Sequence, residues 1–209
     1  MDTVFILRAA TAVKTALLAH EAEIESLDRA IGDGDHFINI RRGIAVITDM
    51  HDELAALEPD LVLQKIGMKL LSTIGGASGP LIGSFFISMA KCVKVQGADT
   101  LPGIAAAFAA GVDAIKSRGH AEVGEKTMLD VLVPVSLSFT RLSAEGFERN
   151  DLLNVLKREA DQGLATTRDM IASKGRAASL GERAIGHLDP GAKTCQVIIH
   201  TICDLTAEN

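Results

Sequence analysis

The chain has 209 residues, of which 47% are hydrophobic, so it is long enough to build a sizeable core in one large domain or two small ones. With 21 basic and 27 acidic residues, its net charge of −6 excludes the basic surface that DNA or an anionic membrane would need. The three cysteines form no CxxC pair, which excludes a disulfide framework or a zinc knuckle and favours a cytoplasmic protein.

The predicted secondary structure is helical throughout. Apolar residues recur at steps of three and four, the spacing of an amphipathic helix, as in the stretch 150–173. We predict helices over 3–26, 36–57, 60–73, 80–96, 101–118, 125–143, 150–173 and 190–206. The connections are short, and we find neither a linker nor an internal repeat. We therefore expect an all-α antiparallel bundle that forms a single domain over residues 1–209.

The first predicted helix has an apolar stretch that could be mistaken for a signal peptide. Arg8 and Lys14 interrupt it, and no apolar run reaches the roughly 18 residues that a membrane span needs. We expect no leader and no membrane association. The other helix starts carry caps or early prolines, namely Gly79-Pro80, Thr100 before Leu101-Pro102, Asn150-Asp151 and Asp189-Pro190.

Glycine and charged residues are concentrated in four connections, 28–36, 72–80, 117–127 and 174–192. These follow the first, third, fifth and seventh predicted helices. Alternate turns of an up-and-down bundle lie at the same end. We therefore expect the four connections to meet at one rim, and the remaining turns to be ordinary solvent loops.

The first of these connections places Asp28, Asp33 and Asp35 within eight residues. Like charges this close repel one another unless a cation lies among them. The spacing does not match an EF-hand, but three carboxylates suit Mg²⁺, which completes its coordination with water and substrate phosphate. The alternative is structural, because a lone DGD is more often a turn in which Asp35 caps the next helix.

The second connection, GGASGP at 75–80, ends at a helix N-terminus, where free N–H groups can bind an anion. A tight link between two helices is an equally good reading, and no Walker A motif is present. The long loop 174–192 carries several charges, most of which we expect to be solvated. Within it, Arg176 is the best candidate for stabilising charge on a transferring phosphoryl group.

Four motifs, "IGDGDH" with Asn39 following, "GGASGPL", "RGHAEVGEKTM" and "KGRAASLGERAIGHLDPGA", resemble the nucleotide-binding L subunit of dihydroxyacetone kinase, in order and over essentially the whole chain. The resemblance implies an eight-helix antiparallel barrel with a nucleotide and two Mg²⁺ ions at one rim. It implies that Asp28, Asp33 and Asp35 bind the metal and that Arg176 is catalytic. The nucleotide-binding residues it implies are His36, Asn39, Gly75, Gly76, Ser78, Gly79, Gly119, Thr127, Met128, Arg176 and Asp189.

The resemblance also implies a division of labour between subunits. A separate K subunit holds the ketose through a histidine hemiaminal, and the L subunit presents the terminal phosphoryl group, so this chain should be inactive alone. The nucleotide is either a resident ADP, rephosphorylated by a phosphotransferase-system protein, or an exchangeable ATP. The alternatives are a kinase subunit for another ketose such as erythrulose, a regulatory module that docks on a transcription regulator, and a bundle that binds nothing.

Two residues depart from the pattern usual in that family. Phe37 stands where glycine is common, and Arg41 where a small or polar residue is common. We expect Phe37 to crowd the turn beside the metal site, and Arg41 to add a positive charge one helical turn away.

Overall fold

The computed structural model describes residues 1–208, which form ten α-helices and two 3₁₀ helices and no strand. The helices are α1 (Thr3–Ala19), α2 (Glu21–Ile31), α3 (His36–Asp49), α4 (His51–Leu54), α5 (Pro59–Thr73), α6 (Ser78–Gln96), α7 (Leu101–Gly119), α8 (Leu129–Ala144), α9 (Arg149–Thr166), η1 (Thr167–Asp169), η2 (Arg176–Ala184) and α10 (Pro190–Ala207).

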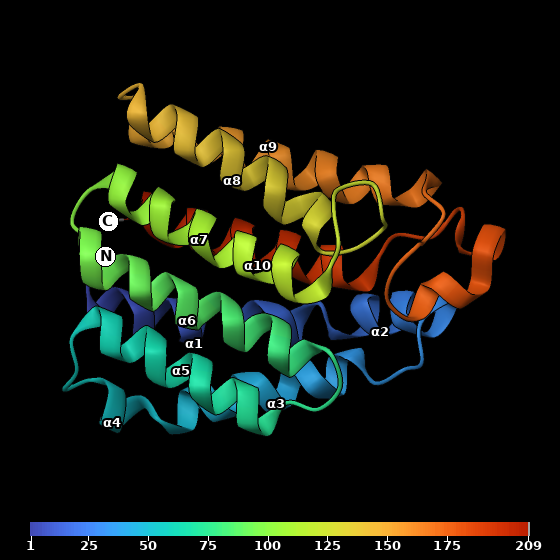
Figure 1. Ribbon diagram of the computed structural model, residues 1–209, viewed down its shortest axis with the longest axis horizontal. Coiled ribbons are helices and arrows are strands. Elements are labelled where there is room, and N and C mark those ends of the chain that lie inside the picture. The colour runs from blue at the N-terminus through green and yellow to red at the C-terminus, as the bar shows by residue number, and fades with distance from the viewer. Residues whose placement is uncertain (209) are drawn as a thin grey trace.

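The long helices close into a ring. Going around it, α1 packs on α3, α3 on α5, α5 on α6, and so on through α7, α8, α9 and α10, which packs back on α1. Neighbouring helices in this ring run in opposite directions (Figure 1). The predicted all-α antiparallel barrel is therefore confirmed. In residues 1–208 no single helix is long and apolar enough to cross a membrane.

The four glycine-rich connections lie at one end of the barrel, as the alternation of turns predicted. In Figure 1 the α2–α3, α5–α6 and α7–α8 connections and η2 are all at the right, whereas both termini are at the left. The end with the four connections, here called the rim, therefore collects the polar segments of the chain.

The prediction of one helix over 3–26 is wrong. The chain breaks at His20 into α1 and α2, whose axes differ by 64°. The His20 ring Nδ1 lies 2.9 Å from the Ala16 carbonyl, and the backbone N–H of His20 bonds the same carbonyl, so the residue ends α1. The bend carries α2 to the rim.

The predicted helix over 36–57 ends at Asp49 and is followed by the short α4. The helix predicted to begin at 125 begins at Leu129, because the carboxylate of Asp130 binds two N–H groups of the preceding loop. The predicted 150–173 helix ends at Thr166, where threonine hydroxyls bond the last helical carbonyls. The errors at Leu129 and at Thr166 each shorten a helix and lengthen a rim loop.

Several predicted helix signals are confirmed. The side chains of Thr100 and Asp189 accept N–H groups of the first turns of α7 and α10. Pro134 lies inside α8. The caps expected at Gly79 and Asn150 are misplaced by one or two residues, since α6 begins at Ser78 and α9 at Arg149.

Candidate functional site

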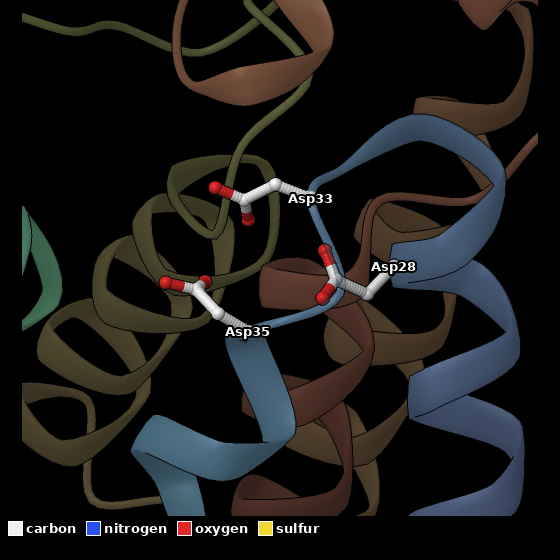
Figure 2. A group of neighbouring side chains, drawn as sticks. All are labelled: Asp28, Asp33 and Asp35. Atoms are coloured by element: carbon white, nitrogen blue, oxygen red, sulfur yellow. The ribbon is translucent and has the colours of Figure 1, made fainter.

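Three aspartates meet at the start of α3. Carboxylate oxygens of Asp28, Asp33 and Asp35 all lie within 4.8 Å of one another (Figure 2). Asp28 is buried in the last turn of α2, whereas Asp33 and Asp35 are exposed in the α2–α3 connection. Close oxygen ligands, some open to solvent, form the kind of site in which Mg²⁺ keeps water or phosphate as further ligands.

The buried member of this cluster is fixed by its surroundings. Oδ2 of Asp28 accepts the backbone N–H of His36 at 3.0 Å, so Asp28 caps α3 from the end of α2. A β-carbon at Gly32 would lie 1.8 Å from Oδ1 of Asp28, which leaves room for glycine alone. The local sequence therefore builds the pocket into which this carboxylate fits.

The alternative role considered for Asp35, capping the helix it precedes, is wrong. Asp35 occupies the N-cap position, but within residues 1–208 its side chain makes no cap hydrogen bond. Burial, and then a hydrogen bond and the charge of Asp33, raise the pKa of Asp35, while Asn39 and Arg176 act in the opposite sense. A carboxylate next to another carboxylate is a position that a cation would stabilise.

His36 is half-buried against the first turns of α10. Its Nε2 lies 2.9 Å from Oγ1 of Thr194, whose hydroxyl donates to the Pro190 carbonyl at 2.8 Å. Nε2 of His36 is therefore the donor in the bond to Thr194. Burial lowers the pKa of His36, which favours the neutral ring. Thr194 was missed in the sequence, where nothing distinguishes it from other helical threonines.

Asn39 is buried one turn after Asp35, and Oδ1 of Asn39 accepts from Nη1 of Arg42 at 3.3 Å. Its side chain also acts to lower the pKa of Asp35. The structure thus brings Asn39 beside Asp35, while its role in binding a nucleotide stays a prediction.

The expectation that Phe37 crowds the metal site is wrong. The ring is 2% exposed and packs with Leu17, Ile24 and Val197 in the core, away from the carboxylates. Arg41 forms an ion pair with Glu21 of α2. Its guanidinium carbon Cζ lies 5.8 Å from the centroid of the Phe37 ring. Both residues contact α2 from α3, so they help to fix the relative position of the two helices that flank the aspartate cluster.

Arg176, at the start of η2, reaches the aspartate cluster. Its Nε lies 2.8 Å from Oδ2 of Asp33, and its side chain is 71% exposed. η2 packs against α2, which holds this part of the long loop beside the cluster. The structure therefore joins the predicted catalytic arginine to a predicted metal ligand.

The glycine-rich turn before α6 combines an open stretch with a tightly packed one. Gly75 and Gly76 are exposed, and β-carbons there would meet no atom within 4 Å. Gly79 is buried, and a β-carbon there would lie 2.2 Å from the Ile74 carbonyl oxygen. In the described chain no side chain caps α6, whose first N–H groups near Ser78 are available to an anion. The reading as a tight link between helices therefore holds at Gly79, and anion binding at the open part of the turn stays a prediction.

The segment after α7 lies between α6 and α10. A β-carbon at Gly119 would be 3.3 Å from Leu81 of α6, and Met128 packs beside Gly191 of α10. The N–H of Thr127 donates to Oδ2 of Asp130 at 2.7 Å. Gly119, Thr127 and Met128 are thus placed at the rim by helix packing.

Asp189 lies at the other side of Met128, as the N-cap of α10. Its Oδ2 accepts the N–H of Ala192 at 2.7 Å. Burial raises the pKa of Asp189 to about 7. The Asp189 side chain therefore caps the N-terminus of α10.

Three buried polar residues beneath the rim were missed in the sequence. Lys126, Asp130 and Thr167 are each at most 1% exposed. Lys126 lies in the motif RGHAEVGEKTM, where an isolated lysine reads as a solvated charge. Only the fold encloses it.

The DAK2 domain matches residues 30–204. The chain is 40% identical over 179 residues to the ADP-binding subunit DhaL of PEP-dependent dihydroxyacetone kinase from Escherichia coli, covering 86% of this chain and 85% of that one. It is 37% identical over 194 residues to the ADP-binding subunit DhaL of PTS-dependent dihydroxyacetone kinase from Lactococcus lactis, with 90% of each chain covered.

A solved structure has the same fold. The dihydroxyacetone kinase from C. freundii, in complex with AMP-PNP and Mg²⁺, superposes with a TM-score of 0.73 at 24% identity. The match covers 96% of this chain and 34% of that longer chain.

Proposed function

Since the chain belongs to the DAK2 domain family, we propose that it is the nucleotide-binding subunit of a dihydroxyacetone kinase. In this role it presents the terminal phosphoryl group of a Mg²⁺-bound nucleotide to a short ketose held on a separate K-type subunit. The observation that carries the proposal is the meeting of Asp28, Asp33 and Asp35 within 4.8 Å, with Arg176 beside them.

The donor set fits a hard divalent cation. Asp28, Asp33 and Asp35 would hold two Mg²⁺ ions, which when bound neutralise phosphate oxygens and the charge that develops during transfer. The AMP-PNP and Mg²⁺ in the C. freundii relative support this choice. The exposed side of the cluster, at Asp33 and Asp35, leaves room for the phosphates.

Residues around the cluster have distinct roles in this proposal. The uncapped N-terminus of α6, with Gly75, Gly76, Ser78 and Gly79, would bind phosphate oxygens through backbone N–H groups. His36 and Asn39 come from α3, and His36 bonds Thr194 of α10 on that side of the cluster. Arg176, whose side chain is exposed beside Asp33, would stabilise the charge on the transferring group.

The nucleoside half of the ligand would lie against the segment after α7. Gly119 and Met128 pack there on α6 and α10, and Thr127 is held by the bond of its N–H to Asp130 of α8. Asp189 would act from the first turn of α10, where it orders the backbone next to Met128. Together these segments would bind ADP or ATP across the rim.

The names of the bacterial relatives support ADP as the resident nucleotide and a phosphotransferase-system donor. We place the protein in the cytoplasm, where such a donor would meet it, and treat residues 1–209 as one domain. The bacterial relatives are named as subunits of a kinase, which supports the proposal that turnover requires a separate K-type partner.

The test is to purify the protein in Mg²⁺, pass it through a gel-filtration column, denature it and identify the released nucleotide by chromatography. ADP retained in Mg²⁺ and lost after EDTA is the expected result. A protein that retains no nucleotide and binds no added ADP or ATP would overturn the proposal. A coupled assay with a K-type subunit separates a kinase subunit from a purely regulatory module, which would give no turnover.

A further inference from the structure

Lys126 is a buried cation with no part in the aspartate cluster. It is 1% exposed, and its backbone has φ of +60°, unusual for a residue with a side chain. Burying an ammonium group is costly unless hydrogen bonds and opposite charges replace its water. Its partners therefore indicate why a lysine is placed there.

The ammonium of Lys126 binds both ends of the long rim loop. It donates to the carbonyl of Thr167, directly after α9, and to the carbonyl of His187, 2.6 Å away and just before α10. One cation thus closes the base of the loop from 167 to 189. Burial lowers the pKa of Lys126, and the charges of Asp189, Asp169 and Asp130 oppose that effect.

Neighbouring contacts strengthen the same junction. Oε1 of Glu125 accepts the hydroxyl of Ser173 at 2.8 Å, and the Glu125 carbonyl accepts the Ser173 N–H at 3.4 Å. Within the loop, the N–H of Gly186 donates to the Arg168 carbonyl at 2.8 Å. Two consecutive residues of the segment after α7, Glu125 and Lys126, therefore bind the long loop.

This junction connects the two halves of the proposed nucleotide site. Thr127 and Met128 directly follow Lys126 on one side, and Arg176 lies in the loop that Lys126 closes. On the far side of the loop, Arg176 meets Asp33. A shift at the base of the loop would move Arg176 relative to both the nucleoside segment and the aspartates.

We propose that Lys126 is a positioning residue, whose buried ammonium joins the segment after α7 to the loop from 167 to 189 and so holds Arg176 and Met128 in register for a nucleoside diphosphate. The inference rests on the proposed function and deepens it. Lys126 itself need not touch the nucleotide.

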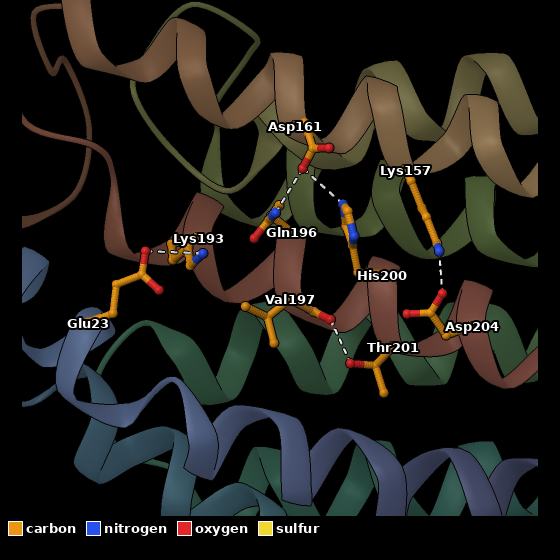
Figure 3. Close-up of polar contacts among 9 residues, drawn as sticks. All are labelled: Glu23, Lys157, Asp161, Lys193, Gln196, Val197, His200, Thr201 and Asp204. Carbon is orange, nitrogen blue, oxygen red and sulfur yellow. Dashed lines mark hydrogen bonds and ion pairs between the residues drawn. The ribbon is translucent and has the colours of Figure 1, made fainter.

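The test compares Lys126→Met with Lys157→Met. Methionine keeps the apolar stem of the lysine and removes the ammonium, which leaves two carbonyls unpaired. Lys157 is a matched control, because it forms an ion pair with Asp204 between α9 and α10, away from the rim (Figure 3). Mg·ADP affinity is measured by calorimetry at a temperature where all proteins are fully folded, and amide exchange is measured without nucleotide.

We expect Lys126→Met to weaken Mg·ADP binding about tenfold or more, since bonds to a charged donor are lost. Amide exchange should accelerate within 168–188 and remain unchanged elsewhere. Lys157→Met should match the wild type in both measurements. In combination with Arg176→Met, the Lys126→Met effect on affinity should shrink, because both changes act through the same loop.

Unchanged affinity and unchanged exchange in Lys126→Met would overturn the inference. If that variant loses its helical circular dichroism, Ser173→Ala decides, because Ser173 lies near the surface in the same junction. Faster loop exchange with weaker binding in Ser173→Ala supports the inference, and wild-type behaviour overturns it. If the wild type itself fails to bind Mg·ADP, the proposed function fails together with the inference, a result distinct from a failure of Lys126→Met alone.

Discussion

The guanidinium Nε of Arg176 lies 2.8 Å from Oδ2 of Asp33, although the two residues belong to opposite ends of the chain. Both side chains are substantially exposed, and such pairs contribute only about 0–1 kcal/mol to stability. The contact is therefore weak enough to be exchanged for a cation on Asp33 and a phosphate on Arg176. It places the arginine at the site before a nucleotide arrives.

Arg176→Met should lower turnover with the K-type partner by about 100-fold or more, as removal of a charge-stabilising group does. Affinity for Mg·ADP should fall by less than turnover, about tenfold, because the metal ligands and the α6 N-terminus remain. Steady-state kinetics and calorimetry check the two quantities separately. A variant that loses affinity and keeps its turnover number would assign Arg176 to binding alone.

Asp33→Asn should abolish Mg²⁺-dependent ADP binding, with a loss beyond the roughly 10–100-fold caused by changing outer partners of a metal site. Asp52→Asn is the control, because Asp52 is a fully exposed carboxylate on α4, at the other end of the barrel. Calorimetric titration of each protein with Mg·ADP checks the prediction. Intact binding in Asp33→Asn would rule out the proposed metal site.

Gly32→Ala should displace the Asp28 carboxylate, since the new β-carbon would lie 1.8 Å from Oδ1. We expect a loss of about 1–3 kcal/mol in the free energy of unfolding, typical of overpacking, together with weaker Mg²⁺ binding. Gly146→Ala, at a positive φ in the turn after α8, should destabilise the protein and leave metal affinity unchanged. Urea unfolding and metal titration distinguish the two variants.

Asp189 should make stability depend on pH. Its pKa is raised by burial to about 7 from an ordinary 3.8, so between these values the folded protein binds a proton that the unfolded chain does not. The free energy of unfolding contributed by this group therefore falls as pH rises from about 4 to about 7. Asp189→Asn keeps an N-cap acceptor and should flatten this dependence.

The measurement for Asp189 is the urea midpoint at pH 5 and pH 8 of the nucleotide-free proteins, with Mg²⁺ removed. The difference between wild type and Asp189→Asn at each pH isolates the group, because other titrating residues are shared. An equal difference at both pH values would contradict the prediction.

The cysteines should differ in reactivity. Burial raises the pKa of Cys195 and of Cys203 to about 12, so their reactive thiolate forms are scarce at pH 8. Cys92 on α6 is only half-buried. With a disulfide reagent at pH 8 we expect at most one thiol to react in the folded protein, and all three after unfolding in urea. Rapid reaction of two or more native thiols would show that the α9–α10 packing opens.

The aspartate cluster could be predicted because its members are close in sequence. Asp28, Asp33 and Asp35 lie within eight residues. The intervening glycines form a short turn that brings the three carboxylates together. The barrel was predictable for a similar reason, since the helical spacing of apolar residues and short turns fix an alternating topology. Both inferences depend on local geometry alone.

Contacts between distant segments could not be predicted in this way. Thr194 supports His36 from α10, and Phe37 enters the core although its neighbours in sequence form the rim. The break at His20 was missed because an amphipathic pattern continues through it, while the ring of His20 ends the helix. In each case a partner far along the chain, or a single side-chain bond, decided the outcome.

The sequence by itself determined most of the helices, the rim to which the polar turns belong and the clustering of the three aspartates, because these follow from periodicity and short spacings. Only the tertiary structure decided that Lys126 is buried and bound to both ends of the loop that carries Arg176. The physical reason is that a charge is costly to bury unless its partners are already in place. Those partners, the carbonyls of Thr167 and His187, come together only when α9 and α10 have packed.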